Sequence, residues 1–377
     1  MAHYFLFPEK DATIYSHPQR SILNSSLDEI LTITDEDYLG RKYPSRILIQ
    51  FNNNEVNNVI NNKVTGDFSA SLHLWQTEHV NLALDQHLEL YPLAESWNNG
   101  TGRYNNIPVS SDGVSWDHPI STDDGGTWDI SSYGTGITGS WSASAAGGGS
   151  WYTGSGFEVN KTYGYGDVLD LSFDVTLPII KHYSGSYLSA TYPDGVDNNG
   201  FILKRSSSQE FNDIEDGALN FFSLDTHTIY PPYLDISWDD SVYNTEFATD
   251  DTILKSGDIF VTLRNNKEKY KKEEEITFRL NVRELYPTRR FVTSSNYLDI
   301  KYFTSKSYYS LIDYATEETI IPFDEYTKLS ADNQGMYFKL YMNGLQEGRY
   351  YKLLFKHENN DGITIFDENY YFNITRS

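Results

Sequence analysis

Apolar and polar residues alternate with a period of two through much of this 377-residue chain. The clearest runs are residues 47–51, 169–175, 234–238, 276–282 and 336–342. Successive side chains of a strand point to opposite faces of a sheet, so each run predicts a strand with one face in a core. Helical periodicity is limited to short candidates at 25–31 and 323–329, and Asn-Gly turns such as 359–362 separate the strands. The pattern therefore predicts an all-β protein.

The tryptophan distribution divides the chain. All seven Trp residues precede residue 239, while Lys, Arg and Tyr become frequent beyond 245. The acidic stretch 239–246 between these regions has the composition of a linker. We therefore predict two domains, 1–245 and 246–377. We expect the first to be a jelly-roll-like sandwich and the second an immunoglobulin-like sandwich.

Charge excludes several partners. The formal net charge is −24 and the pI is about 4.6. Nucleic-acid backbones and anionic membranes are bound by clustered Lys and Arg, so neither is an expected partner. Aromatic residues make up 15% of the chain. Because Tyr and Trp favour pleated, half-buried surfaces and are enriched at interfaces, this composition indicates a protein that binds.

The sequence has no cysteine and no apolar run long enough for a membrane-spanning helix. Residues 1–10 lack the basic start and apolar stretch of a signal peptide. We expect synthesis in a cytoplasm, with any external role reached by assembly or lysis.

Candidate catalytic groups are weak. Neighbouring carboxylates, as at 123–124 and 239–240, point to opposite faces of a strand and cannot face each other across a cleft. The chain has no phosphate-binding loop and no nucleophile elbow. We therefore expect no enzymatic activity and no cofactor. Residues 194–200 are rich in oxygen ligands but lack the ligand spacing of an EF-hand loop, so a structural calcium ion is a minor alternative to a simple turn.

Two regions supply candidate contact residues. The Gly- and Ser-rich stretch 134–156 reads as a long loop, in which Trp141 and Trp151, with the nearby Trp128, are candidate glycan platforms. The run 264–290 has nine basic and five acidic residues. Its arginines are either solvated or dock on an acidic neighbouring subunit. These arginines are Arg279, Arg283, Arg289 and Arg290.

Tyrosines of the C-terminal strands form a third candidate group. Tyr337, Tyr341 and Tyr350 alternate with inward-facing residues such as Phe338 and Phe355. These tyrosines are either strand formers, because Tyr has a high β propensity, or interface anchors, because the ring buries a large area with little loss of side-chain entropy. The sequence favours neither interpretation.

The N-terminal domain resembles the DNRLRE-type, or disaggregatase-related, β-sandwich. The most telling segment is 88–102, which contains Glu95-Ser96-Trp97 and then Gly100-Thr101, followed by Gly113-Val114-Ser115-Trp116. Further similar segments are 10–15, 45–51, 72–75, 199–204 and 231–238. The resemblance covers nearly all of the domain and implies a sandwich found in extracellular and virion proteins and akin to some carbohydrate-binding modules.

The whole chain also resembles virion structural proteins of contractile-tailed bacteriophages of marine cyanobacteria, with segment 308–323 similar to a module that recurs in them. This resemblance implies a place in the virion as a tail, baseplate or neck component. The sequence therefore predicts a non-enzymatic structural protein that contacts other virion proteins in multiple copies. The alternative is a carbohydrate-binding module for a cell-surface or extracellular polysaccharide.

Overall fold

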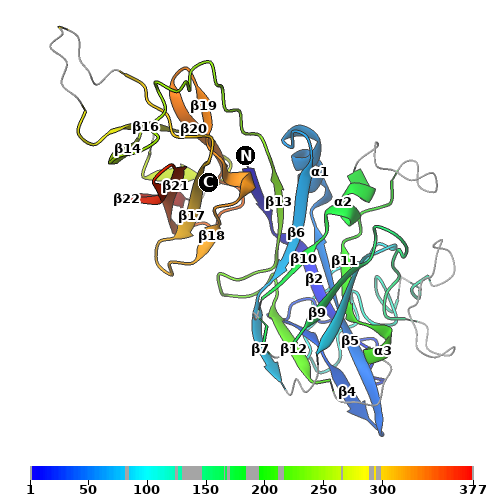
Figure 1. The fold of residues 1–377 in the computed structure, drawn as a ribbon. Coiled ribbons are helices and arrows are strands. Elements are labelled where there is room, and N and C mark those ends of the chain that lie inside the picture. Colours follow the sequence, from blue (N-terminus) through cyan, green and yellow to red (C-terminus); the bar gives the residue numbers. More distant parts are fainter. Residues whose placement is uncertain are drawn as a thin grey trace. The chain divides into compact units, whose positions relative to one another are not determined.

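The structure is a computed structural model that describes residues 2–80, 85–123, 126–129, 147–164, 166–167, 170–183, 195–210, 216–264, 266–287, 293 and 299–375. Strands dominate the described chain and most pair antiparallel, which confirms the all-β sandwich prediction. Figure 1 labels these elements along the chain.

The chain forms two compact units. The N-terminal unit comprises residues 6–63 and 69–235, and the C-terminal unit comprises residues 1–5, 64–68 and 236–377. The division after residue 235 differs from the predicted linker at 239–246. The reason is that this acidic stretch is hydrogen-bonded into the C-terminal unit: the Ala331 N–H donates to the Val242 carbonyl at 3.0 Å, and the Asn244 N–H donates to the Ala331 carbonyl at 3.1 Å.

The N-terminal unit contains a six-stranded sheet of order β2-β5-β11-β8-β9, with β4 paired to β5. Its strands are β2 (Pro8–Tyr15), β4 (Asp35–Tyr38), β5 (Arg41–Phe51), β8 (Gln86–Pro92), β9 (Val159–Tyr163) and β11 (Phe201–Arg205). A three-stranded sheet has the order β3 (Ile30–Ile33), β12 (Ala218–Phe222) and β7 (Gln76–Val80). In another sheet, β13 (Tyr233–Trp238), β6 (Phe68–Leu74) and β10 (Leu171–Asp174) are successive neighbours.

Both faces of the six-stranded sheet are buried. On one face Ile47 and Leu203 are buried, and on the other Leu48 and Ile202 belong to a cluster with the rings of the connection between β8 and β9. The members from that connection are Leu93, Trp97, Val114, Trp116, Trp128 and Trp151. Burial on both faces explains why β5 and β11 carry apolar residues at consecutive positions. It corrects the expectation that residues 47–51 have only one face in a core.

The described residues of this unit include three short helices: α1 (Asn53–Asn62), α2 (Thr176–Tyr183) and α3 (Ser207–Glu210). The Asn52 side chain caps α1 by accepting the N–H groups of Asn54 and Glu55. Val56 and Val59 are buried at helical spacing, so α1 is a helix that the period-two analysis misses. The predicted helix at 25–31 is absent, because β3 begins at Ile30.

The C-terminal unit has immunoglobulin-like topology. One sheet has the order β14 (Ile259–Leu263), β16 (Glu275–Glu284), β20 (Gly335–Tyr341) and β19 (Ser330–Asp332). The other has the order β15 (Lys269–Lys271), β22 (Gly362–Thr375), β21 (Tyr350–Asn359), β17 (Ser307–Asp313) and β18 (Thr319–Ile321). These are the ABED and GFC orders of an immunoglobulin sandwich, with β15 added parallel to β22 and β18 added antiparallel to β17. The prediction of an immunoglobulin-like sandwich for this part of the chain is confirmed.

Local details of this unit agree with the sequence pattern. Phe278, Phe338 and Phe355 are buried, as the alternation predicts. Residues 359–362 connect β21 to β22 as a hairpin in which Asn359 faces Gly362. The predicted helix at 323–329 is reduced to one 3₁₀ turn, Glu325–Thr327. The N-terminal strand β1 (Ala2–Leu6) brings Tyr4 against Tyr341, with ring centroids 5.6 Å apart.

Candidate functional site

The predicted glycan-platform tryptophans of the described chain are core residues. Only 2% of Trp128 and 1% of Trp151 is exposed. Trp128 donates its indole N–H to the Ser115 carbonyl at 3.1 Å, and the Trp151 ring packs against Tyr91. Because these rings cover the second face of the six-stranded sheet, they offer no stacking surface to a sugar, and that prediction is corrected. Trp141 lies outside the described residues.

A buried ion pair lies beneath these indoles. The Arg46 guanidinium on β5 donates two hydrogen bonds to the Glu210 carboxylate on α3, at 2.9 and 2.8 Å. It also lies 4.6 Å from the Trp116 ring centroid and 5.2 Å from that of Trp151. Both side chains are about 99% buried, since their exposed fraction is 1%. This pair fixes α3 to the sheet beneath the tryptophan layer.

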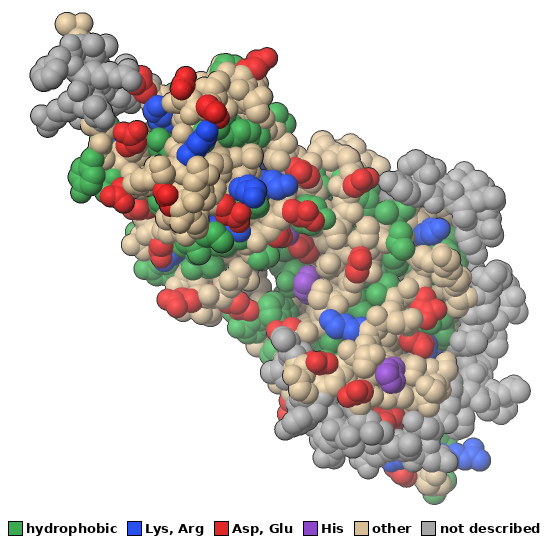
Figure 2. All heavy atoms as spheres, in the orientation of Figure 1, with side chains coloured by type: hydrophobic (Ala, Val, Ile, Leu, Met, Phe, Trp, Pro, Cys, Tyr) green, Lys and Arg blue, Asp and Glu red, His purple; other side chains and the backbone are tan. Residues whose placement is uncertain are grey.

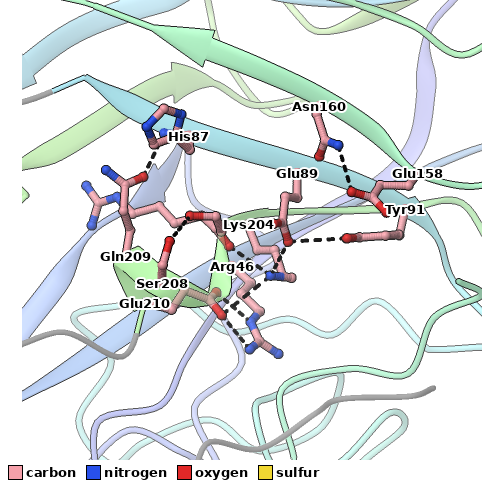
Figure 3. Close-up of polar contacts among 12 residues, drawn as sticks. Arg46, His87, Glu89, Tyr91, Glu158, Asn160, Lys204, Ser208, Gln209 and Glu210 are labelled. Atoms are coloured by element: carbon pink, nitrogen blue, oxygen red, sulfur yellow. Dashed lines mark hydrogen bonds and ion pairs between the residues drawn. The ribbon is translucent and has the colours of Figure 1, made fainter.

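Lys204 on β11 extends the network. Its ammonium donates to the Glu89 carboxylate at 2.7 Å and lies 3.8 Å from Glu210. Figure 3 shows Lys204 between these two carboxylates, with Tyr91 directed at Glu89. Burial and the neighbouring Glu89 raise the pKa of the Tyr91 hydroxyl. A basic residue directly beside an apolar run, such as Lys204 after residues 201–203, could have predicted this network. The alternation analysis did not consider such residues.

Arg205 makes a second buried pair. Its guanidinium bonds to Asp35 on β4, and its Nε donates to the Gln86 side chain at 2.7 Å. Burial raises the pKa of Asp35 to about 6, against the opposing effect of Arg205. In these two pairs and in the Lys204 contacts, each cation faces a carboxylate, so the network is suited to holding strands together.

A polar hollow of about 230 Å³ lies beside the network and is lined by residues of β8 and β9 and by the residue that precedes α3, including His87, Glu89, Asn160 and Ser206. His87 Nδ1 lies 3.1 Å from the Thr162 hydroxyl oxygen. Glu89 is the one carboxylate among the described lining residues, and it is engaged by Lys204. Glycoside hydrolysis uses two facing carboxylates, which this hollow does not supply.

The predicted arginine contacts of the C-terminal unit are used within that unit. Arg279 makes two hydrogen bonds to Asp332, at 3.0 and 2.8 Å, and lies 5.2 Å from the Tyr337 ring centroid. Arg283 lies 4.6 Å from the Phe260 ring centroid. Both side chains thus have intramolecular partners. Arg289 and Arg290 lie outside the described residues.

The predicted tyrosines behave differently from one another. Tyr337 is half-buried beside Arg279. Tyr341 is buried, with Tyr4 on one side and Trp238 at a centroid distance of 5.7 Å. Burial raises the pKa of Tyr341 to about 12. The prediction that Tyr341 is an interface anchor is therefore corrected, because residues of β1 and the end of β13 cover its ring.

A cluster of exposed tyrosines lies on the outer side of the sheet that contains β21 and β22. Tyr314, Tyr350 and Tyr371 are 54%, 48% and 43% exposed. The Tyr371 ring centroid lies 5.7 Å from that of Tyr314 and 6.4 Å from that of Tyr350. We call these three residues the tyrosine face.

Two lysines of β21 near the tyrosine face are paired with carboxylates. Lys352 pairs with Asp367 at 2.6 Å, and Lys356 pairs with Glu358 at 3.1 Å. Elsewhere the chain is strongly acidic, and Figure 2 shows acidic side chains scattered over the side of both units in view. An aromatic surface with paired charges has the composition of an interface centre, where unpaired charge is depleted.

No protein-family model matches the chain, and no curated protein sequence matches it. The functional argument therefore depends on the residues themselves.

Metal clusters and membrane-spanning helices were sought among the described residues. Within them, no three His, Asp or Glu side chains gather as a metal site, and no helix is long and apolar enough to cross a membrane. Asp194 of the predicted calcium loop lies outside the described residues, so the calcium hypothesis stays a prediction.

Proposed function

We propose that this chain is a non-enzymatic structural protein of a tailed-bacteriophage virion, in the tail, baseplate or neck, that binds other virion proteins. The virion assignment is supported by the sequence resemblance of segments 88–116 and 308–323. The binding role is supported by the tyrosine face. Two β-sandwich units are consistent with a binding protein.

The tyrosine face is the single observation that carries the proposal. Tyr350 and Tyr371 are nearly half exposed, although the neighbouring Tyr351 and Phe372 on the opposite side of the sheet are buried. Tyr rings bury a large area with little loss of side-chain entropy, so a partner that covers them gains binding free energy. Several copies in one particle would add avidity to each weak contact.

The virion assignment is tested by mass spectrometry and immunolabelling of purified particles from a phage that encodes this chain. The proposal expects the chain in the particle at fixed stoichiometry. Absence of the chain from purified particles would overturn it.

The tyrosine face is tested by Tyr350→Ser with Tyr371→Ser in a phage complementation assay. We expect loss of the chain from particles while the purified variant stays folded. The matched control is Tyr286→Ser, because Tyr286 is 80% exposed and lies outside the tyrosine face. Equal incorporation of the double variant and the control would contradict a role for this face.

A carbohydrate-binding function is the second candidate, and a different aromatic cluster favours it. The Trp75 ring centroid lies 5.2 Å from that of Tyr230 and 6.1 Å from that of Tyr233. The Tyr233 ring stacks on His73 at a centroid distance of 4.6 Å. All four side chains are partly exposed. A glycan array tests this candidate. Binding by the native chain that Trp75→Ala removes would favour it, and absence of glycan binding would argue against it.

A further inference from the structure

The hairpin formed by β4 and the start of β5 extends beyond the six-stranded sheet. Among the described strands, residues 41–43 of β5 have register partners on β4 alone, whereas pairing with β2 begins at Ser45 and pairing with β11 lies within 47–49. Figure 1 shows this hairpin at the lower end of the N-terminal unit. Its turn consists of Leu39 and Gly40. We call Leu39, Gly40 and Arg41 the hairpin tip.

Leu39 has a backbone conformation that a leucine rarely adopts. Its φ is +55°, and that of Gly40 is +75°. Positive φ at both central residues is typical of a type I′ turn, for which Asn-Gly is a preferred pair. In the left-handed region the Cβ of Leu39 lies close to the following carbonyl oxygen, an unfavourable contact that Asn offsets by local hydrogen bonds. The turn would therefore be more stable with Asn at position 39.

The Leu39 side chain is also 87% exposed. Single exposed apolar side chains are common on protein surfaces, so exposure alone indicates no function. Leu39, however, gains no burial within this chain and strains its own turn as well. Strained residues that local preference does not explain are candidates for functional contacts. Leu39 therefore has the properties of a side chain that a partner buries.

The hairpin that carries the tip is braced on both strands. Tyr38 and Tyr43 pack against the buried His17, with ring centroids 4.8 and 5.8 Å from that of the imidazole. Lys42 pairs with Asp37 at 3.4 Å across the two strands. A two-stranded hairpin without such contacts is only marginally stable in water. Because the bracing holds the tip in place, a partner that binds it loses little entropy in ordering it.

Arg41 places a positive charge beside Leu39. Its side chain is exposed and takes part in no ion pair among the described residues, whereas the neighbouring Lys42 is paired. An apolar pocket gains free energy by burying Leu39, and Arg is enriched among the residues that dominate binding at interfaces. The chemistry that fits the hairpin tip is therefore an apolar pocket with a carboxylate at its rim.

We propose that the hairpin tip inserts Leu39 into an apolar pocket of a partner protein, while Arg41 binds an Asp or Glu at the rim of that pocket. A lipid surface fits less well. The chain has a formal net charge of −24, which anionic lipids repel, and one leucine buries too little area to hold a protein on a bilayer. The site is separate from the tyrosine face and does not depend on the virion assignment.

The strain at Leu39 is tested by thermal unfolding of the purified full chain. Leu39→Asn should raise the melting temperature of the N-terminal unit by about 2–4 °C, because Asn-Gly suits the turn. The control is Ile363→Asn, which should bring no gain, because Ile363 is 66% exposed but has no positive φ. An unchanged or lower melting temperature for Leu39→Asn would overturn the proposal.

The partner is sought by photo-crosslinking in the cells that naturally produce the chain. Asp37, whose side chain is 57% exposed, is replaced by p-benzoylphenylalanine, and the crosslinked peptides are identified by mass spectrometry. We expect crosslinks to one partner protein, at an apolar site next to an Asp or Glu. Leu39→Asn in the same chain should lower the crosslink yield about tenfold although the variant is more stable, since the buried leucine is lost.

Arg41→Glu should also lower the yield, because it places like charges together, and Arg264→Glu is its matched control at an exposed arginine of the C-terminal unit. Equal yields from these two variants, no crosslink, or crosslinks only to lipid or to a second copy of this chain would overturn the proposal. Because the crosslinks are read in cells, absence of the chain from purified particles would overturn the virion assignment alone.

Discussion

Arg46 and Glu210 are 164 residues apart in the sequence and meet in two hydrogen bonds beneath the tryptophan layer. Neither side chain reaches water. A buried pair contributes little net stability compared with apolar replacements, yet loss of one partner leaves the other charge buried and unpaired. The contact therefore acts as a lock between α3 and β5.

The first prediction concerns this lock. Glu210→Ala should lower the free energy of unfolding by about 3–5 kcal/mol, because the Arg46 charge stays buried without its carboxylate. Urea unfolding measures the change. The control is Asp250→Ala, which breaks the exposed pair with Lys255 and should cost no more than about 1 kcal/mol. Similar losses in the two variants would contradict the assigned role of the buried pair.

The second prediction concerns a tyrosine corner in the C-terminal unit. The Tyr351 hydroxyl accepts the Gln346 backbone N–H at 2.8 Å, at the start of the strand equivalent to F in immunoglobulins. Tyr351→Phe should lower the free energy of unfolding by about 1 kcal/mol, since the partly buried Gln346 N–H loses its acceptor. Thermal unfolding tests this. Tyr350→Phe, at the exposed neighbouring position, should leave the melting temperature unchanged.

The third prediction is a pH dependence of the N-terminal unit. Burial raises the pKa of Asp11 to about 8, although its carboxylate accepts the Leu224 N–H. Between its unfolded pKa near 3.8 and pH 8 the folded state holds more protons, so this group makes stability fall as pH rises. Asp11→Asn removes that effect. Its stability relative to the native chain should therefore improve by about 1.4 kcal/mol per pH unit up to pH 8, as followed by urea unfolding.

A gap between Asp11→Asn and the native chain that stays constant from pH 5 to pH 8 would show that the carboxyl group titrates normally. Asn keeps a carbonyl acceptor for the Leu224 N–H, so loss of that hydrogen bond is not expected to mask the result.

The fourth prediction has the opposite sign and concerns the C-terminal unit. Burial lowers the pKa of His357 to about 4, where its ring stacks on Phe303 at 4.4 Å and Nε2 accepts the Thr304 N–H. Below pH 6.5 the unfolded state binds the proton more readily, so stability should fall by about 1.4 kcal/mol per pH unit down to pH 4.

An NMR titration of the imidazole signal, assigned with His357→Gln, measures the pKa of His357 directly. A midpoint near 6.5 would contradict the prediction.

The sequence by itself determined the strands and the inward side of most of them. Alternation depends only on neighbouring residues, so it correctly placed Phe278, Phe338 and Phe355 in the core and the hairpin at 359–362. Alternation missed α1, because this asparagine-rich segment has few apolar residues. The division between the units was predicted from composition at 239–246, whereas the structure divides them after residue 235.

Only the tertiary structure decided which of the residues expected to be exposed are in fact buried. Trp151 lies in a predicted loop and Trp128 lies near it, yet both pack on the second face of a sheet whose strands come from distant parts of the chain. Tyr341 and Tyr350 alternate in the same way, but β1 and the end of β13 cover the first and leave the second exposed. Burial depends on what packs over a residue, and that partner is fixed by contacts between distant segments rather than by local periodicity.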